Sequence, residues 1–261
     1  MTRAQALRQW GIGISAAALL AACGGGGDDG DGGGDDTPAS ASYDGETLVP
    51  AVVEAVGAEE YVHLGLGNHR GRAEVQVDLS YAADQPEFRA ITGDEAGEFL
   101  EFRRVNDRIY VGGEVTDDEW TYMADDDPRA LGDEKEFDAG ATAVLLALDV
   151  PGDYEALEGA VDEVDNQGEE EMSGVTTTHY VLTVDSQAWR EALPEHSVHR
   201  QVEVDDELVV DLWIDEASLP VRLEYAGTGA SDQVRVEYTS WGRPIAVIEP
   251  EGAEPRGSEP S

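Results

Sequence analysis

Apolar and polar residues alternate over much of the chain between residues 61 and 238, which is typical of strands with one buried face. The first alternating runs place Val62, Leu64 and Leu66 on one face, and then Val75, Val77, Leu79 and Tyr81. Further strands are predicted at residues 99–105 and 108–111, 160–165, 176–185, 200–215, 219–226 and 233–238. A tight turn at Asn106-Asp107 should join the first two of these.

Apolar residues at helical spacing are rarer in this chain than apolar residues that alternate as in strands. Residues 46–57 carry Leu48, Val52, Val53 and Val56 on one helical face, and a short helix is predicted at residues 187–193. Residues 141–148 are apolar on nearly all sides, so this segment should be buried or cover something apolar.

Antiparallel hairpins with one apolar face need a second layer over that face, and the few helices must supply it. The pattern therefore predicts an α+β domain over residues 43–248, a curved antiparallel sheet or unclosed barrel with helices packed in its concave face. Residues 249–261 are predicted to be a disordered tail.

The first 22 residues have the pattern of a secretory signal peptide. They contain Arg3 and Arg8, no acidic residue, and an apolar run of 13 residues from Trp10 to Ala22. This run is shorter than the roughly 20 residues that a spanning helix needs. The layout predicts a signal peptide that is removed.

The end of this leader, Leu20-Ala21-Ala22-Cys23, resembles the lipobox of bacterial lipoproteins. The resemblance implies that Cys23, the only cysteine of the chain, carries a thioether-linked lipid and becomes the mature N-terminus. The predicted localisation is the extracytoplasmic face of the cell membrane, with the lipid as anchor. A lipidated Cys23 would leave the folded part without any thiol, and therefore without a disulfide.

Residues 24–42 contain Gly, Asp, Ser, Thr, Ala and Pro and no large apolar side chain, so together with Cys23 they form a predicted disordered tether over residues 23–42. A Gly-rich coil of 19 residues spans about 25 Å.

The chain is strongly acidic. Arg3 and Arg8 lie in the leader, so the remainder has 14 basic and 57 acidic residues, a formal charge of −43. Such a surface repels the phosphates of nucleic acids, which excludes them as partners. It also repels anionic lipid, so attachment to the membrane must come from Cys23. High ionic strength should relieve the self-repulsion.

Several motifs in order resemble the actinobacterial LppX/LprG lipoproteins. They are residues 108–111 followed by Glu119-Trp120, then residues 174–182, and then residues 211–216 with 219–222. The resemblance spans residues 48–247 and implies the LolA-like fold, an unclosed barrel with helices across its mouth, and an acylated lipid or lipoglycan held in the cavity. The extreme acidity and the single lysine, Lys135, depart from that family.

Alternation reports a buried face, and a packed core explains it as well as a ligand cavity does. The resemblance favours the cavity, and its lining is then predicted to include Leu64, Leu66, Val77, Leu79, Val144, Leu145, Leu148, Leu208, Val210, Leu212, Val221 and Leu223. Trp213 lies on the opposite face of its strand, where neighbouring elements should cover it.

No constellation of residues predicts an enzyme, a cofactor or a metal site. His196 and His199 have a spacing that could serve a metal, but Pro194 and Ser197 favour a solvated loop there. Two functions remain. One is a lipoprotein that binds or transfers an acylated lipid, and the other is a cell-surface adaptor or sensor that contacts a membrane or cell-wall protein and has no lipid ligand.

Overall fold

The computed structural model describes residues 43–67, 73–92, 99–127, 148–194, 197–228 and 233–256. Val144 and Leu145 of the predicted cavity lie outside these residues, as do the leader, Cys23, the tether and most of the predicted 141–148 helix. Among the described helices, none is long and apolar enough to cross a bilayer.

Twelve strands form one sheet in the order β12-β6-β5-β4-β3-β2-β1-β11-β10-β9-β8-β7. Neighbouring strands are antiparallel, except that β12 pairs with β6 in parallel. The strands are β1 (Tyr61–Gly67), β2 (Ala73–Ser80), β3 (Glu87–Thr92), β4 (Leu100–Val105), β5 (Arg108–Gly112), β6 (Thr121–Ala124), β7 (Val161–Met172), β8 (Val175–Asp185), β9 (Glu207–Ile214), β10 (Pro220–Ala226), β11 (Gln233–Thr239) and β12 (Glu254–Pro255).

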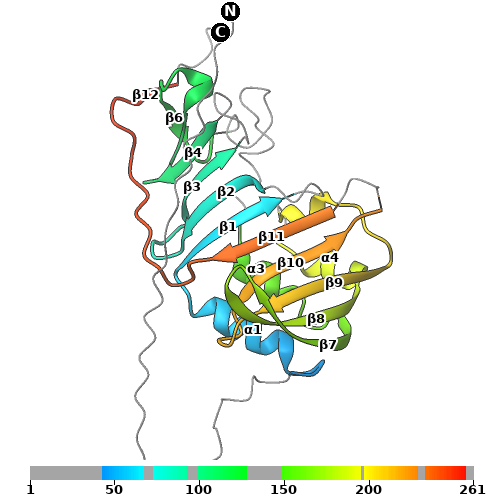
Figure 1. The fold of residues 1–261 in the computed structure, drawn as a ribbon. Coiled ribbons are helices and arrows are strands. Elements are labelled where there is room, and N and C mark those ends of the chain that lie inside the picture. The colour runs from blue at the N-terminus through cyan, green and yellow to red at the C-terminus, as the bar shows by residue number, and fades with distance from the viewer. Residues whose placement is uncertain are drawn as a thin grey trace, which may run out of the picture. The chain divides into compact units, whose positions relative to one another are not determined.

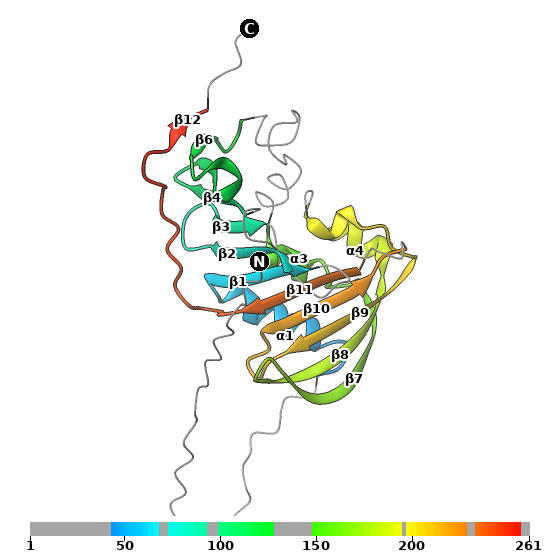
Figure 2. The ribbon, with the colours of Figure 1, turned by 45° about the horizontal axis from the view of Figure 1, so that its top comes forward.

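The described helices are short. They are α1 (Leu48–Gly57), α3 (Val150–Glu155) and α4 (Ser186–Ala192), with 3-10 turns η1 (Glu114–Thr116) and η2 (Val198–Gln201). In both views of the ribbon, α1, α3 and α4 lie against the part of the sheet formed by β1 and β8–β11 and away from β4–β6 (Figures 1 and 2). The predicted fold class, an unclosed antiparallel sheet with helices on one face, is confirmed.

The inner face of the sheet, which faces the helices, carries the core. Val62 and Leu64 of β1 are 0% and 1% exposed, and Leu212 of β9 is 1% exposed. Trp189 of α4 is also buried, at 1% exposed. Asp185 accepts hydrogen bonds from the backbone N–H groups of Gln187 and Ala188, which satisfies the first turn of α4.

The outer face of the sheet, which points away from the helices, is polar and carries several ion pairs. Arg89 and Arg103 each donate to Glu101 Oε1 at 2.7 Å. Burial raises the pKa of the Glu101 carboxyl, but the bonds from the two arginines outweigh it and the pKa is lowered. The alternation of apolar and charged residues thus has its expected cause, with charged side chains on the side away from the helices.

The turn between β4 and β5 is the predicted one. Asn106 and Asp107 both have positive φ, 53° and 56°, which is the conformation of a type I′ hairpin turn. Most other predicted strands begin and end within a few residues of the prediction. Two predictions differ more. The first part of the strand predicted at residues 200–215 forms η2, and the strand itself begins at Glu207. The strand predicted at residues 160–165 continues to Met172.

The segment after β11 differs from the predicted tail. It runs along one side of the sheet to reach β6 (Figure 1). Arg103 donates to the carbonyl of Ile248 at 2.8 Å, and Asn106 donates to Glu249 at 2.8 Å. Residues 249–256 therefore have a defined path, and the expectation of disorder from residue 249 does not hold for them.

Candidate functional site

The inner face of β2–β5 is a continuous apolar surface. Register pairs Val77 with Ala90, Ala90 with Phe102, and Phe102 with Val111. The next row contains Leu79, Phe88 and Ile109. All seven residues are at most 2% exposed. We call this set the β2–β5 apolar face.

None of the three described helices lies over β4 and β5 in either view (Figures 1 and 2). Phe102 of β4 and Val111 of β5 therefore lie away from the backbones of α1, α3 and α4, although they belong to the same buried core cluster as Val52 and Tyr154 of those helices. An apolar face of this kind is suited to contact hydrocarbon, because removing apolar surface from water is favourable whatever the partner is.

The positively charged side chain of Arg104 lies at the end of this face. Arg104 pairs in register with Phe88 on one side and Ile109 on the other, so it shares their side of the sheet. Its guanidinium donates to Asp125 Oδ2 from Nη2 at 2.7 Å and from Nε at 3.0 Å. The Arg104 and Asp125 side chains are only 12% and 14% exposed, so their charges are largely withdrawn from water.

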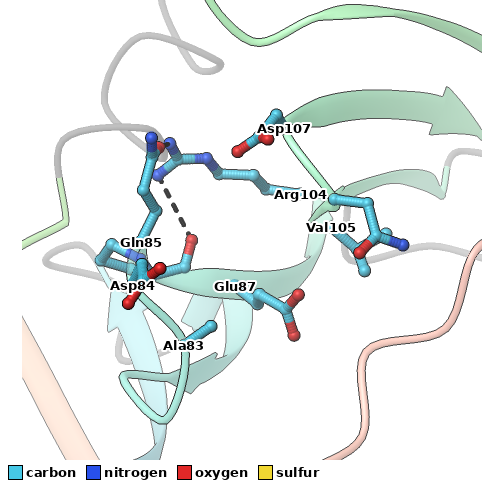
Figure 3. Close-up of a pocket in the computed structure, with 9 residues that line it drawn as sticks. Ala83, Asp84, Gln85, Glu87, Arg104, Val105 and Asp107 are labelled. Carbon is cyan, nitrogen blue, oxygen red and sulfur yellow. Dashed lines mark hydrogen bonds between the residues drawn. The ribbon is translucent and has the colours of Figure 1, made fainter.

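Arg104 extends from the apolar face into a polar pocket. Its Nη1 donates to the carbonyl of Pro86 at 3.2 Å, and its Nη2 contacts Gln85. Figure 3 shows the side chain reaching from β4 toward the loop that precedes β3. The pocket has a volume of about 370 Å³ and lies between the β2–β3 loop and the β4–β5 turn. We call it the turn pocket; it is lined by Ala83, Asp84, Gln85, Pro86, Glu87, Arg104, Val105, Asn106 and Asp107.

The lining of the turn pocket is rich in hydrogen-bond acceptors. Asp84, Glu87 and Asp107 contribute carboxylates, while Arg104 is already paired with Asp125. A phosphate would meet repulsion from three carboxylates, whereas hydroxyl groups can donate to them. The pocket can therefore hold a neutral, hydroxyl-rich group.

The predicted cavity residues are distributed over both halves of the sheet. Eight are buried in the core cluster, namely Leu64, Val77, Leu79, Leu148, Leu208, Val210, Leu212 and Leu223. Leu66 packs against that cluster and is partly buried. Of the ten described residues, Val77 and Leu79 belong to the β2–β5 apolar face, and the role of the set in holding a ligand stays a prediction.

Val221 departs from the alternation that grouped it with Leu223. The register between β9 and β10 shifts between Pro220 and Arg222, so Val221 lies at a bulge. A bulge sets two residues against one and interrupts the period of two. Val221 consequently lines a pocket together with Arg222 and Glu237.

A group of largely buried polar side chains joins α3, η2 and β10, and we call it the Asp153 cluster. Ser197 donates to Asp153 Oδ1 at 2.6 Å, and His199 Nε2 lies 3.7 Å from Asp153 Oδ2. His199 Nδ1 lies 2.9 Å from the hydroxyl of Tyr225. His199 is 3% exposed, so the predicted solvated loop is wrong at this residue.

Burial sets the charges of the Asp153 cluster. It raises the pKa of Asp153 to about 7, although the Ser197 hydrogen bond opposes the rise and Asp149 adds to it. Burial also lowers the pKa of His199 to about 4. The serine hydroxyl bonds the carboxyl group and not the imidazole, so the geometry is not that of a nucleophile with its base.

Side chains of the neighbouring strands β7 and β8 cover Trp213, as predicted. It is 8% exposed and stacks on His179 with centroids 4.3 Å apart and planes at 9°. Its indole N–H also bonds Glu170 of β7. Trp213 is therefore not presented to a protein partner. Among the described residues there is no group of three or more side chains suited to hold a metal.

Sequence reasoning missed most of the β2–β5 apolar face. Strand β3 was not predicted, because its inward residues are only Phe88 and Ala90 and a run of two is a weak signal. Phe102, Ile109 and Val111 were in predicted strands but were not assigned to a cavity. Their register opposite β3 was the information that the sequence lacked.

Comparison with solved structures identifies the fold. LprF from Mycobacterium bovis is 17% identical, and the match covers 80% of this chain and 97% of that chain with a TM-score of 0.54. The lipoprotein LppX from Mycobacterium tuberculosis is 15% identical, over 78% of this chain and 98% of that chain, with a TM-score of 0.49. No protein-family model and no curated protein matches the sequence.

The match to LprF shows that this chain has the fold of these actinobacterial lipoproteins. The resemblance to the LppX/LprG group, with its LolA-like sheet, is thereby confirmed at the level of the fold.

Proposed function

We propose that this protein is a membrane-anchored, extracytoplasmic lipoprotein that binds or transfers an acylated lipid or lipoglycan. The observation that carries the proposal is the β2–β5 apolar face, whose Phe102 in β4 and Val111 in β5 are buried where none of the described helices lies over those strands. The fold shared with LprF and the lipobox-like end of the leader support it.

The anchor is the lipid on Cys23. One acyl chain binds a membrane only marginally, at about 0.8 kcal/mol per buried methylene, so firm attachment needs two or three chains. The acidic domain cannot supply the remainder by electrostatics, because a formal charge of −43 repels anionic lipid.

The acyl chain of the ligand lies along the β2–β5 apolar face. Its methylenes contact Phe88, Phe102 and Val111 once the parts of the chain that bury these residues move aside, and desolvation of the acyl chain itself supplies the binding free energy without any cofactor. The polar end of the ligand lies beyond Arg104, in the turn pocket. The acceptor-rich lining suits a hydroxyl-bearing headgroup such as a sugar or glycerol.

Mass spectrometry of the protein purified without detergent tests the ligand. We expect a co-purifying acylated lipid in the wild type and much less in Ala90→Leu, because the added side chain fills the space between Val77 and Phe102. Ala156→Leu is the matched control, since Ala156 is also buried but lies at the C-terminal end of α3. Equal lipid in both variants, or none in the folded wild type, would refute the lipid proposal.

The anchor is tested separately. Cys23→Ser should move the protein from the membrane fraction to the soluble fraction. The intact mass of the native protein should show a lipidated N-terminal cysteine and no leader. A native protein with a free Cys23 thiol would refute the anchor and leave the ligand measurement unaffected.

A further inference from the structure

A second pocket, outside the proposed ligand site, lies where the β7–β8 hairpin, the β9–β10 turn and the end of β11 meet. Its volume is about 380 Å³. The walls are largely apolar and include Met172, Val175, Leu219, Val221 and Trp241. This volume lies toward the lower end of the roughly 300–1,000 Å³ common for small-molecule sites. We call it the tether-side pocket.

Trp241 on one side of the tether-side pocket is held by a ring contact and a hydrogen bond, and Val175 on another side is exposed. Trp241 stacks on Tyr238 at a centroid distance of 5.6 Å and donates its indole N–H to the carbonyl of Pro220 at 2.8 Å. Val175, at the tip of the hairpin, is 41% exposed. Val175 also lines the pocket, so its side chain extends the apolar lining to the surface.

The segments that form the apolar part of this pocket are uncharged, although Glu171 and Glu216 beside them are exposed. Residues 172–175 and 239–241 carry no charged side chain. The charged groups in the lining are engaged. Arg222 donates to Glu237 at 2.7 Å, and Asp215 accepts from the backbone N–H groups of Ala217 and Leu219 at 2.9 Å. The local chemistry is that of a hydrocarbon site with satisfied polar edges.

The tether joins the domain at the same end. Tyr43, the first described residue, shares a hydrogen bond of 2.6 Å with the hydroxyl of Ser218, which directly precedes Leu219. Nineteen residues separate Tyr43 from Cys23, a span of about 25 Å for a flexible coil. A lipid on Cys23 would therefore keep the pocket within a short distance of the bilayer.

We propose that this end of the domain docks on the membrane surface, with Val175 at the interface and the tether-side pocket occupied by hydrocarbon of a bilayer lipid. The inference rests on the proposed lipidation of Cys23. It adds a defined orientation, because the hairpin tip and Trp241 face the lipid while the ion pairs of Glu101 with Arg89 and Arg103 on the outer face remain in water.

Spin labels on engineered cysteines test this orientation. Lipidation of Cys23 consumes the only native thiol, so Val175→Cys and Val209→Cys each carry a single reactive thiol. Val209 is the matched control, since it is 50% exposed and pairs with Thr183, eight residues along β8 from Val175. At about 3.3 Å per residue the two sites are roughly 26 Å apart.

The labelled, lipidated proteins are reconstituted in phosphatidylcholine vesicles. We expect the label at residue 175 to be relaxed more by oxygen than by a water-soluble nickel complex, and the label at residue 209 to show the reverse. Equal exposure of both labels to the nickel complex would overturn the docking proposal.

Unlabelled wild-type protein separates the two possible failures. A reactive Cys23 thiol in that sample would refute the anchor, and the docking proposal with it. A blocked Cys23 with both labels in water would refute the docking alone. Both labelled positions are exposed, so neither label should disturb folding.

Discussion

The two halves of the sheet bury their apolar faces in different ways. Strands β1 and β8–β11 lie against α1, α3 and α4, so residues such as Leu212 are packed by the domain's own helices (Figure 1). The β2–β5 apolar face is equally buried but lies away from those helices. The two halves do not differ in depth of burial, because the chain buries both in one core cluster. They differ in their distance from the described helices, and the proposed ligand would replace part of the cover of the β2–β5 apolar face.

Polar residues follow the same division. In the helix-covered half, Asp153 of α3 bonds Ser197 and lies beside His199. At the end of the β2–β5 apolar face, Arg104 leads into the turn pocket (Figure 3). The polar groups of the helix-covered half are thus enclosed in the core, whereas Arg104 connects the β2–β5 apolar face to a pocket.

Truncation of one core residue in each half should give the largest effect. Leu212→Ala should cost about 2–5 kcal/mol of unfolding free energy, with or without bound lipid. Phe102→Ala should cost about 3–5 kcal/mol without lipid, because its ring is fully buried by the chain, and a clearly different amount in the lipid-loaded protein, because the ligand then replaces part of that packing. Urea denaturation of loaded and extracted samples measures both costs. An equal cost of Phe102→Ala in the two states would remove the distinction between the halves.

The Asp153 cluster gives a dependence on pH that belongs to the helix-covered half. The folded pKa of Asp153 is raised to about 7, so its contribution to stability is present below pH 3.8 and is lost as the pH rises to 7. The folded pKa of His199 is lowered to about 4, so its contribution is present above pH 6.5 and is lost as the pH falls to 4. The two slopes oppose each other between pH 4 and 6.5.

Asp153→Asn should therefore leave the slope of His199 uncompensated. Relative to wild type, the variant should gain on the order of 2–4 kcal/mol in unfolding free energy between pH 4 and pH 8. Urea denaturation across this range measures the difference. Glu101→Gln is the control of opposite sign, since the pKa of Glu101 is lowered and its contribution is lost as the pH falls. A difference that does not change with pH would contradict the account of the cluster.

Salt should change the stability of the whole acidic domain, and it does not distinguish the two halves of the sheet. We expect the melting temperature to rise between about 10 mM and 1 M NaCl, because the screening length falls from about 30 Å to about 3 Å. Each kcal/mol of repulsion removed should raise Tm by roughly 2–4 °C for a domain of this size. Calorimetry on the wild type is sufficient, and a flat melting temperature would contradict the expectation.

The smallest effect concerns the hairpin that holds Arg104 in place. Asn106 has a φ of 53°, which an alanine adopts at a cost of about 1–2 kcal/mol. Asn106→Ala should lower the unfolding free energy by about that amount, while Asn106→Gly should be close to neutral. Losses of the same size in both variants would assign the effect to the Glu249 contact instead of the turn.

Much of the helix-covered half was predictable from the sequence. Clean alternation such as that of Leu208, Val210 and Leu212 fixes strand and face together. The turn at Asn106-Asp107 was predictable because few residues accept positive φ. In contrast, the bulge at Val221 and the weak strand β3 depend on pairing with distant strands, and no local pattern encodes that register.

The candidate site was less predictable for the same reason. Arg104 follows another arginine in β4 and looks like a surface charge in the sequence. Only the register that sets it between Phe88 and Ile109 shows that it lies on the apolar side. The path of residues 249–256 was missed because short contacts from Arg103 and Asn106 order a segment with no periodicity of its own.

The central claim is that hydrocarbon lies on the β2–β5 apolar face. A fatty acid bearing a diazirine near its methyl end can be bound to the full mature protein, activated by light and located by mass spectrometry of the cross-linked peptides. The account predicts adducts within residues 87–92, 100–105 and 108–112, and few in β8–β10. Adducts confined to β8–β10, or none on the folded protein, would contradict it.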